Sequence, residues 1–373
     1  MQTTMQHDIA FLDFLRGWAA LLVFFHHASI LGGGPSFLSG HIGQEAVNAF
    51  MLASGFLIYF QCSIGKTYHL LSNKEGIKNF YIRRFFRIAP AYYVSLIVAL
   101  VLSDNLGFSR EIIAETLPST ATNMDRYYIE NKWESFLIHI SFVFGAIPSY
   151  SFSTPLPDWS LGLEMQFYAF FPALFFFFKR SFLKYYIFFI MLMFGIWFMS
   201  NQEGLIFPMP SYLPLKFHNF AAGIALSHLL LNQENESKYH QYIIVIITIV
   251  ALYFGNQTGI MPILFLFSWW WVCRENNVKE GRLVSIVHYM FTHKSSKILA
   301  EISYSLYIFH LILMLPFFAY ILKGRELSSI EWILSSLVLL FLSMGFSYLI
   351  YKYVEIPGIK MGKKQIKSLH YFK

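Results

Sequence analysis

Apolar stretches separated by short polar segments follow one another along this chain from residue 10 to residue 354. A helix needs about 20 apolar residues to cross the hydrocarbon core of a membrane, and ten stretches come near that length. They are residues 10–31, 45–61, 88–104, 158–178, 183–200, 212–231, 241–255, 258–273, 298–322 and 331–353. The pattern predicts an all-α fold, a polytopic transmembrane bundle of about ten helices.

Four apolar stretches of the chain differ from a simple membrane span. Residues 136–147 are too few to cross the core and predict a re-entrant or interfacial segment. Residues 241–255 and 258–273 are short enough to form a re-entrant pair instead, which would keep the count even. The first stretch carries Asp13 and Arg16 and has no small-residue cleavage site after it. We therefore expect it to be a retained span and not a signal peptide.

The composition excludes an ordinary soluble protein. Hydrophobic residues make up 56% of the 373 positions and charged residues 13%, and the mean hydropathy is +0.50. A soluble core could not bury that much apolar surface. Because the apolar stretches run through the whole chain without a low-complexity linker, we expect a single membrane domain over residues 1–373.

The basic residues predict the orientation. With the N-terminus inside, 21 of the 28 Lys and Arg residues fall in inner loops and 5 in outer segments, as the positive-inside rule requires. An even number of spans then puts both termini on the cytoplasmic side. The net charge of +7 is spread over short loops between spans, so the expected partners are membrane lipids and an anionic ligand, and not nucleic acid.

Charged side chains inside apolar helices are costly, so each needs a partner or a function. Arg16 and His27 are eleven residues apart, which places them on one stripe of a helix about 16 Å apart along its axis. His26 stands beside His27. A hydrogen-bonded packing histidine is the alternative, but the aligned arginine favours a functional role for His27.

Two arginines precede the predicted span 88–104 in the segment NFYIRRFFRIAP. Arg84 and Arg87 are three residues apart and share a helix face, which suits two planar guanidinium groups that hold phosphate oxygens. Ordinary anchoring on the inner side of the membrane is the alternative.

The segment PDWSLGLEMQFYAFFP places Glu164 about two turns inside the span 158–178. A carboxylate at that depth should be neutral or find a cation or a histidine, and we favour a functional role. Asp158 and Trp159 are expected at the membrane interface, where an N-cap and an interfacial aromatic are sufficient explanations.

Further polar residues lie in later spans. Lys216 opens the span 212–231 together with His218, and it either reaches the surface or contacts a substrate. His310 lies inside the span 298–322 near small serines, where contact between helices is the main expectation. Glu355 ends the last span and is expected to pair with a basic loop.

Taken in order, these segments resemble the acyltransferase-3 family of bacterial membrane acyltransferases. LDFLRGWAALLVFFHH is similar to the family's first helix through Arg16 and His27, and GQEAVNAFMLASGFLI to its Ser-Gly-Phe helix. FYIRRFFRIAP carries the Arg-x-x-Arg element, and WSLGLEMQFY the Trp-Ser-Leu-x-x-Glu element. ISYSLYIFH and VEIP are similar to the last two motifs. The likeness covers nearly the whole chain.

Two positions depart from the family pattern. Phe14 stands where a glycine is common, and Lys216 where an arginine is frequent. Neither departure removes a proposed catalytic group. Some relatives carry an additional C-terminal hydrolase-like domain, whereas about 20 residues follow the last predicted span here, so we expect no fused second activity.

The resemblance implies an O-acyltransferase of the bacterial inner (plasma) membrane. Its co-substrate would be acyl-CoA, most simply acetyl-CoA, and its acceptor a hydroxyl of a cell-surface glycan, such as a capsule or lipopolysaccharide, or of a lipid-linked precursor. No bound cofactor and no metal are expected, and a homo-oligomer stays open.

The expected scheme gives each candidate residue a role. Arg16, Arg84 and Arg87 hold the donor, and His27 takes the acceptor proton as a general base. Glu164 orients the imidazole or stabilises its cation, while an acyl-histidine intermediate stays open. The candidate acceptor-binding or supporting residues are His26, Asp158, Trp159, Ser160, Lys216, Tyr304 and His310.

Two other functions fit the same residues. A transporter or exporter of a sugar, lipid or small molecule would use the buried charges as a relay or binding site and would move solute without consuming a thioester. A structural subunit of a polysaccharide assembly complex would tolerate replacement of His27 and Glu164.

Overall fold

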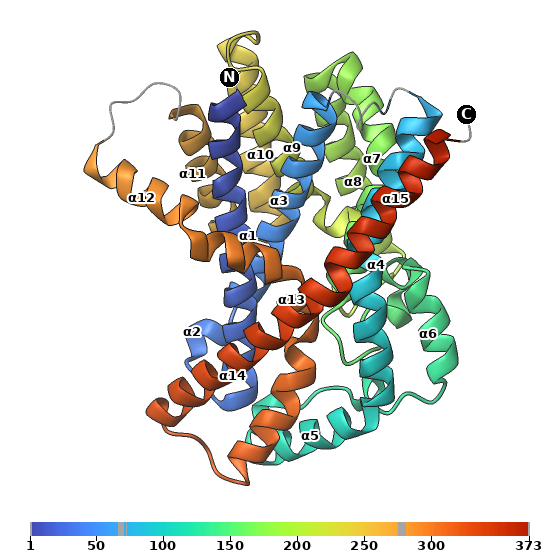
Figure 1. Ribbon diagram of the computed structural model, residues 1–373, viewed down its shortest axis with the longest axis vertical. Coiled ribbons are helices and arrows are strands. Elements are labelled where there is room, and N and C mark those ends of the chain that lie inside the picture. Colours follow the sequence, from blue (N-terminus) through green and yellow to red (C-terminus); the bar gives the residue numbers. More distant parts are fainter. Residues whose placement is uncertain (1, 66–70, 72, 275–280, 372–373) are drawn as a thin grey trace.

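The computed structural model describes residues 2–65, 71, 73–274 and 281–371 of the chain (Figure 1). Within these residues it is built from helices joined by loops and short 3₁₀ turns, with no β-strand, so the all-α prediction is confirmed. The α-helices are α1 (Gln2–Gly32), α2 (Ser36–Ser39), α3 (Ile42–Ile64), α4 (Lys74–Val101), α5 (Ser103–Thr116), α6 (Lys132–Ile140), α7 (Trp159–Arg180), α8 (Phe182–Gln202), α9 (Leu213–Leu231), α10 (Lys238–Asn256), α11 (Ile260–Arg274), α12 (Arg282–Thr292), α13 (Lys294–Leu322), α14 (Ser329–Ile350) and α15 (Ile356–Tyr371).

Among the described residues, eight helical segments are long and apolar enough to cross a membrane. They are Ala10–Gly32 of α1, the helices α3, α4, α7, α8, α10 and α13, and the continuous stretch Ser329–Ser368. All ten predicted stretches are helical, but 212–231 and 258–273 do not meet that standard. The helix α11 has 15 residues, and α9 carries Lys216, His218 and Asn219 in its buried interior.

Two helices extend beyond their predicted ends. The helix α4 begins at Lys74 and not near residue 88, because the Asn73 side chain caps it by accepting from the Gly76 N–H at 2.7 Å. Arg84 and Arg87 therefore lie on the same helix as the predicted span 88–104, and their predicted position on a helix is confirmed. At the other end of the chain, α14 does not stop at residue 353. It passes through a π-helical turn, Tyr351–Glu355, directly into α15.

Two glycines allow α3 and α9 to pack closely. A Cβ atom on Gly55 of α3 would lie 2.2 Å from the carbonyl oxygen of Phe220, and one on Gly223 of α9 would lie 1.9 Å from that of Leu52. Small residues at such a crossing let two helix backbones approach each other. This contact buries α9 and fixes the face of α3 that carries Ser54.

The helices α1 and α13 pack in a similar way. A Cβ atom on Gly17 of α1 would lie 2.8 Å from the Cβ atom of Leu299 on α13. Farther along the same pair, Gly32 faces the ring of Phe318. This packing brings the histidines of α1 and α13 opposite each other.

The segment between α5 and α7 is folded and buried at several points. Residues 136–147 form the end of α6, a left-handed residue at Phe142 with φ 60° and a 3₁₀ turn at Val143–Ala146. Gly145 in that turn packs against Gly162 of α7. Placement of this segment at the membrane interface stays a prediction.

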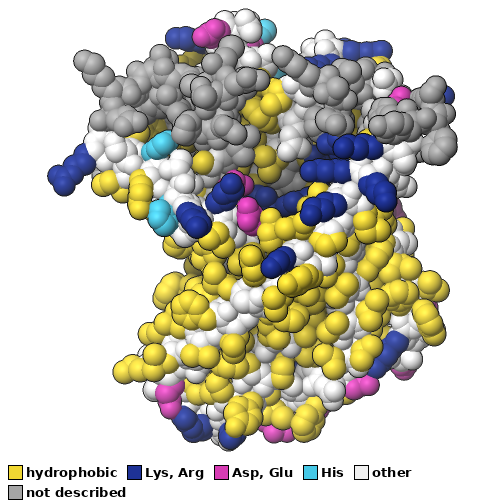
Figure 2. Space-filling view, viewed as in Figure 1, with side chains coloured by type: hydrophobic (Ala, Val, Ile, Leu, Met, Phe, Trp, Pro, Cys, Tyr) yellow, Lys and Arg dark blue, Asp and Glu magenta, His cyan; other side chains and the backbone are white. Residues whose placement is uncertain are grey.

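The surface shows a broad apolar belt. In Figure 2, hydrophobic side chains cover the middle and lower part of the visible face, and Lys and Arg side chains gather above them, beside α15. Both ends of the described chain lie at the upper end of the bundle in Figure 1. The side of the membrane on which they lie stays a prediction.

Candidate functional site

A cavity of about 580 Å³ lies between α1, α3, α4, α7, α13 and α15. This is the size of a site for a small-molecule ligand. Its polar and charged lining residues are Asp13, Arg16, Ser54, Gln61, Arg83, Arg84, Arg87, Ser160, Glu164, Tyr168, Ser303, Tyr304, Tyr307 and Lys363. The cavity therefore gathers six of the twelve candidate site residues, namely Arg16, Arg84, Arg87, Ser160, Glu164 and Tyr304.

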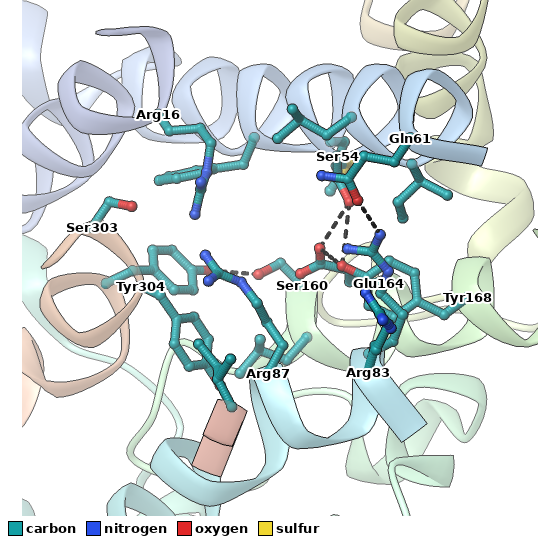
Figure 3. A pocket seen from close by; sticks show the side chains of 18 of the residues that line it. Arg16, Ser54, Gln61, Arg83, Arg87, Ser160, Glu164, Tyr168, Ser303 and Tyr304 are labelled. Carbon is teal, nitrogen blue, oxygen red and sulfur yellow. Dashed lines mark hydrogen bonds between the residues drawn. The ribbon is translucent and has the colours of Figure 1, made fainter. Parts of the chain in front are cut away.

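Positive charge dominates this lining. Figure 3 shows Arg16 and Arg87 reaching into the cavity from opposite walls. No described carboxylate lies within ion-pair distance of Arg16, Arg84, Arg87 or Lys363. These side chains are therefore available to an anionic ligand.

Arg84 is held firmly in the wall. Its Nη2 donates to Gln61 Oε1 at 2.8 Å. Its guanidinium carbon lies 5.6 Å from the ring centres of both Phe80 and Tyr168, within the range of cation–π contacts. The side chain is thus oriented before any ligand arrives.

Glu164 lies on the cavity wall near Ser54 and Tyr168 (Figure 3). Ser54 Oγ donates to Glu164 Oε1 at 2.9 Å, and the Tyr168 hydroxyl donates to the same oxygen. Glu164 makes none of the hydrogen bonds of His27. The structure therefore does not place Glu164 where it would orient the imidazole of His27.

Two tyrosines of α13 close one side of the cavity. The Tyr307 hydroxyl donates to the carbonyl oxygen of Pro157 at 2.7 Å and lies 2.8 Å from Ser160 Oγ. The Tyr304 hydroxyl donates to the carbonyl oxygen of Ile88 at 2.9 Å. Ser160 and Tyr304, two of the seven predicted supporting residues, line the cavity.

His27 lies outside the lining of this cavity. Its Nδ1 is 3.0 Å from Nε2 of His310, a residue that is 1% exposed. The ring centres of His310 and Tyr307 are 6.3 Å apart. Tyr307 thus both lines the cavity and lies next to His310.

His26 has a different environment from His27. Its Nδ1 donates to the carbonyl oxygen of Leu38 at 2.9 Å, and its ring packs on Gly43 at the start of α3. This side chain connects α1 with α2 and with the start of α3. His310, which the sequence assigned to contact between helices, does join α13 to α1.

The other predicted supporting residues lie outside the cavity lining. Asp158 is at the N-cap position of α7, but its carboxylate accepts from Tyr92 and Thr154 instead of capping the helix. Trp159 is 4% exposed and packs in the core, so its side chain is not an exposed interfacial aromatic. Lys216 does not reach the surface, because it is buried and donates to Asn256 Oδ1 at 3.2 Å.

Glu355 does not pair with a basic loop. It is 1% exposed, and Ser305 donates to one of its carboxylate oxygens. Among the described residues, no Lys or Arg lies within ion-pair distance of it. Glu355 belongs to the π-helical turn Tyr351–Glu355 and is buried within the bundle. The sequence pattern did not indicate this departure from the regular α-helix.

Three residues of interest were missed by sequence reasoning. Tyr307 lies within ISYSLYIFH, where the motif drew attention to Tyr304 and His310 instead. Lys363 follows the last predicted span, but the glycines at 358 and 362 are a sign of close helix packing there. Arg126 is buried in the segment before α7 and donates to two carbonyl oxygens, and no local pattern marked it.

A metal centre finds no support in the described side chains, where no three His, Cys, Asp or Glu residues cluster. The site is made of arginines, a lysine, tyrosines, serines and two carboxylates, Asp13 and Glu164, around a cavity, with a histidine pair next to one wall.

Comparisons with known proteins agree with these features. The chain is 30% identical over 163 residues to the peptidoglycan O-acetyltransferase OatA of Listeria monocytogenes, covering 43% of this chain and 23% of that protein. It is 30% identical over 174 residues to a putative O-acetyltransferase of Staphylococcus aureus, covering 44% and 24%. A putative membrane-bound transacylase, BcsY of Komagataeibacter xylinus, is 32% identical over 160 residues, covering 42% and 35%.

The matched segments thus span about a quarter to a third of the length of these relatives. No solved structure matches the chain. The model of the acyltransferase-3 family, described as an acyltransferase domain, matches residues 9–352. This covers nearly the whole helical bundle, and the chain belongs to the acyltransferase-3 family.

Proposed function

We propose that this chain is a membrane O-acyltransferase that moves an acyl group, most simply acetyl, from acyl-CoA to a hydroxyl of a cell-surface glycan or its precursor. The proposal includes placement in the bacterial inner membrane. The observation that carries it is the cavity lined by Arg16, Arg84, Arg87 and Lys363, none of which has a described carboxylate within ion-pair distance.

The chemistry of the donor suits this cavity. Coenzyme A carries phosphate groups at one end and a thioester at the other, joined by a chain of amides and methylenes. Guanidinium groups bind phosphate oxygens through charge-assisted hydrogen bonds. The cavity also has an apolar wall, formed by Val47, Met51, Leu57 and Phe220, which suits the uncharged part of the donor.

His27 is the proposed general base. It takes the proton from the acceptor hydroxyl as that oxygen attacks the thioester carbonyl carbon. The carbon–sulfur bond then breaks, and the proton passes from the imidazolium to the leaving thiolate. For this step the acyl carbon must pass Tyr307, so we propose that the Tyr307 ring turns aside when donor and acceptor bind.

Glu164 has a different role in this proposal from the one expected at first. Its hydrogen bonds to Ser54 and Tyr168 hold the wall against which Arg84 stacks. We propose that Glu164 keeps this wall in place and balances part of the positive charge when the donor has left.

The acceptor class rests on the relatives. OatA is named for peptidoglycan, a cell-surface glycan. The separation of the histidine pair from the cationic cavity supports two entrances, one for the donor and one for the acceptor.

The test uses purified full-length protein in detergent, labelled acetyl-CoA and a panel of glycans with free hydroxyls. We expect release of free CoA together with label in one glycan, and loss of both in His27→Ala at unchanged protein stability. Normal turnover by His27→Ala would disprove the role of this histidine. Solute movement in vesicles without any CoA release would identify a transporter instead.

A further inference from the structure

We infer that His310 is a positioning residue, which together with the carbonyl oxygen of Val23 holds His27 in the tautomer whose Nε2 is the basic nitrogen. The inference rests on the proposed role of His27 and adds which nitrogen acts and which residue selects it. It follows from four hydrogen-bond contacts around the two rings.

The first two contacts fix the proton on His310. Its Nδ1 lies 2.7 Å from the carbonyl oxygen of Tyr307 and 3.1 Å from that of Leu306. Carbonyl oxygens only accept hydrogen bonds, so Nδ1 must carry the hydrogen. A neutral imidazole has one N–H group, which leaves a lone pair on Nε2.

Burial keeps this ring neutral. His310 is 1% exposed, and no described carboxylate lies within ion-pair distance of either His310 or His27. An unpaired cation in such a place is strongly disfavoured. The Nε2 atom of His310 is therefore a hydrogen-bond acceptor.

The other two contacts fix the proton on His27. Its Nδ1 lies 3.0 Å from Nε2 of His310 and 3.1 Å from the carbonyl oxygen of Val23. Both partners are acceptors, so Nδ1 of His27 must be the donor. The lone pair of the neutral ring is then on Nε2, which is the only nitrogen free to take a proton.

The same bond stabilises the ring after proton transfer. When Nε2 of His27 takes the hydroxyl proton, the bond from its Nδ1–H to His310 becomes charge-assisted and stronger. A carboxylate does this in serine hydrolases. Here the partner is neutral, so it adds no negative charge near a donor that carries phosphates.

The neighbouring histidine lacks this arrangement. His26 donates from Nδ1 to the carbonyl oxygen of Leu38 in α2, and none of the hydrogen bonds of His310 involves His26. The rings of His26 and His27 are 5.0 Å apart. Of the two neighbouring histidines, only His27 is hydrogen-bonded to His310 of α13. His27, and not His26, is therefore the histidine whose basic nitrogen is set by this contact.

The experiment compares His310→Phe, His310→Gln and wild type in the CoA-release assay, with full-length protein, acetyl-CoA and the glycan that supports wild-type turnover. Phe keeps the bulk of the side chain and removes the acceptor. We expect kcat to fall about 10- to 100-fold or more, with KM for acetyl-CoA within about twofold. The Gln side chain offers an amide oxygen to Nδ1–H and should recover much of that loss. A purely structural role would lower the amount of folded protein and leave kcat per folded molecule unchanged in both variants.

Histidine ¹⁵N NMR of the full-length protein in lipid gives a second readout that needs no substrate. The resonances of His27, assigned by their loss in His27→Ala, should show a protonated Nδ1 and a bare Nε2 in the wild type. A protonated Nε2 in the wild type, or an unchanged kcat in His310→Phe, would overturn the inference and leave the proposed function standing. Absence of CoA release from the wild type would instead refute the proposed function.

Discussion

Gly223 of α9 packs directly against the carbonyl oxygen of Leu52 on α3, so closely that a Cβ atom would lie 1.9 Å from that oxygen. The opposing atom belongs to the backbone, which cannot move aside as easily as the end of a flexible side chain. The pair sets the distance between the two helices, and with it the position of Ser54 in the cavity wall.

Gly223→Ala should therefore destabilise the bundle by about 1–3 kcal/mol, as overpacking of a tight interior does. The matched control is Gly195→Ala in α8, where a Cβ atom meets nothing within 4 Å. Alanine is the better helix former, so the control should gain about 0.5–1 kcal/mol. Thermal unfolding in detergent measures both, and equal melting of the two variants would contradict the close approach of α3 and α9.

The arginines of α4 should govern donor affinity. Arg84→Gln and Arg87→Gln are each expected to raise KM for acetyl-CoA about tenfold, the loss of one charge-assisted hydrogen bond, with a smaller change in kcat. The control is Arg180→Gln, because Arg180 is exposed at the end of α7 and outside the cavity lining. Initial-rate kinetics measure KM and kcat of the three variants and the wild type at several salt concentrations. The salt series is included because salt weakens interactions between exposed charges.

A loss confined to kcat, with KM unchanged in both α4 variants, would place the donor phosphates elsewhere. An equal effect of Arg180→Gln would point to general attraction by the basic surface and not to the cavity.

Lys363 of α15 should take part in donor binding. The cavity reaches Lys363 because Gly358 and Gly362 pack on Pro90 and Phe86 of α4 and bring α15 close. We expect Lys363→Glu to raise KM for acetyl-CoA about three- to tenfold, in line with one partly exposed charged hydrogen bond. Lys364→Glu changes the net charge equally but lies outside the lining. Equal KM values for the two variants would remove α15 from the donor site.

Arg126 should stabilise the segment before α7. Its Nε donates to Thr154 at 2.8 Å and its Nη2 to Leu156 at 3.0 Å, and it lies over the ring of Phe152. Arg126→Gln should cost about 2–4 kcal/mol, because it breaks a buried network and leaves carbonyl groups without a donor.

The control variant for Arg126→Gln is Arg325→Gln, which removes an exposed ion pair between Arg325 and Glu331. Exposed ion pairs add little to stability, so this variant should melt close to wild type. Limited proteolysis of residues 117–158 gives a local measure. Unchanged melting and proteolysis of Arg126→Gln would contradict the proposed role.

The sequence by itself determined the all-α fold, the positions of ten helical stretches and the family. These follow from local properties, because the length of an apolar stretch and the order of short motifs can be read without knowing any contact. It also selected Arg16, Arg84 and Arg87, since intramembrane or clustered charge is conspicuous in an apolar chain. Their arrangement around one cavity could not be read in the same way.

Only the tertiary structure decided the partners of these residues. His27 meets His310 across 283 positions of the chain, and Glu164 meets Ser54 across 110, so the expected contact between His27 and Glu164 gave way to two separate ones. Such pairings depend on how each helix is rotated about its axis and how closely it packs, and glycines such as Gly17 and Gly223 set both. Helix periodicity fixes which residues share a face, but only packing decides which faces meet.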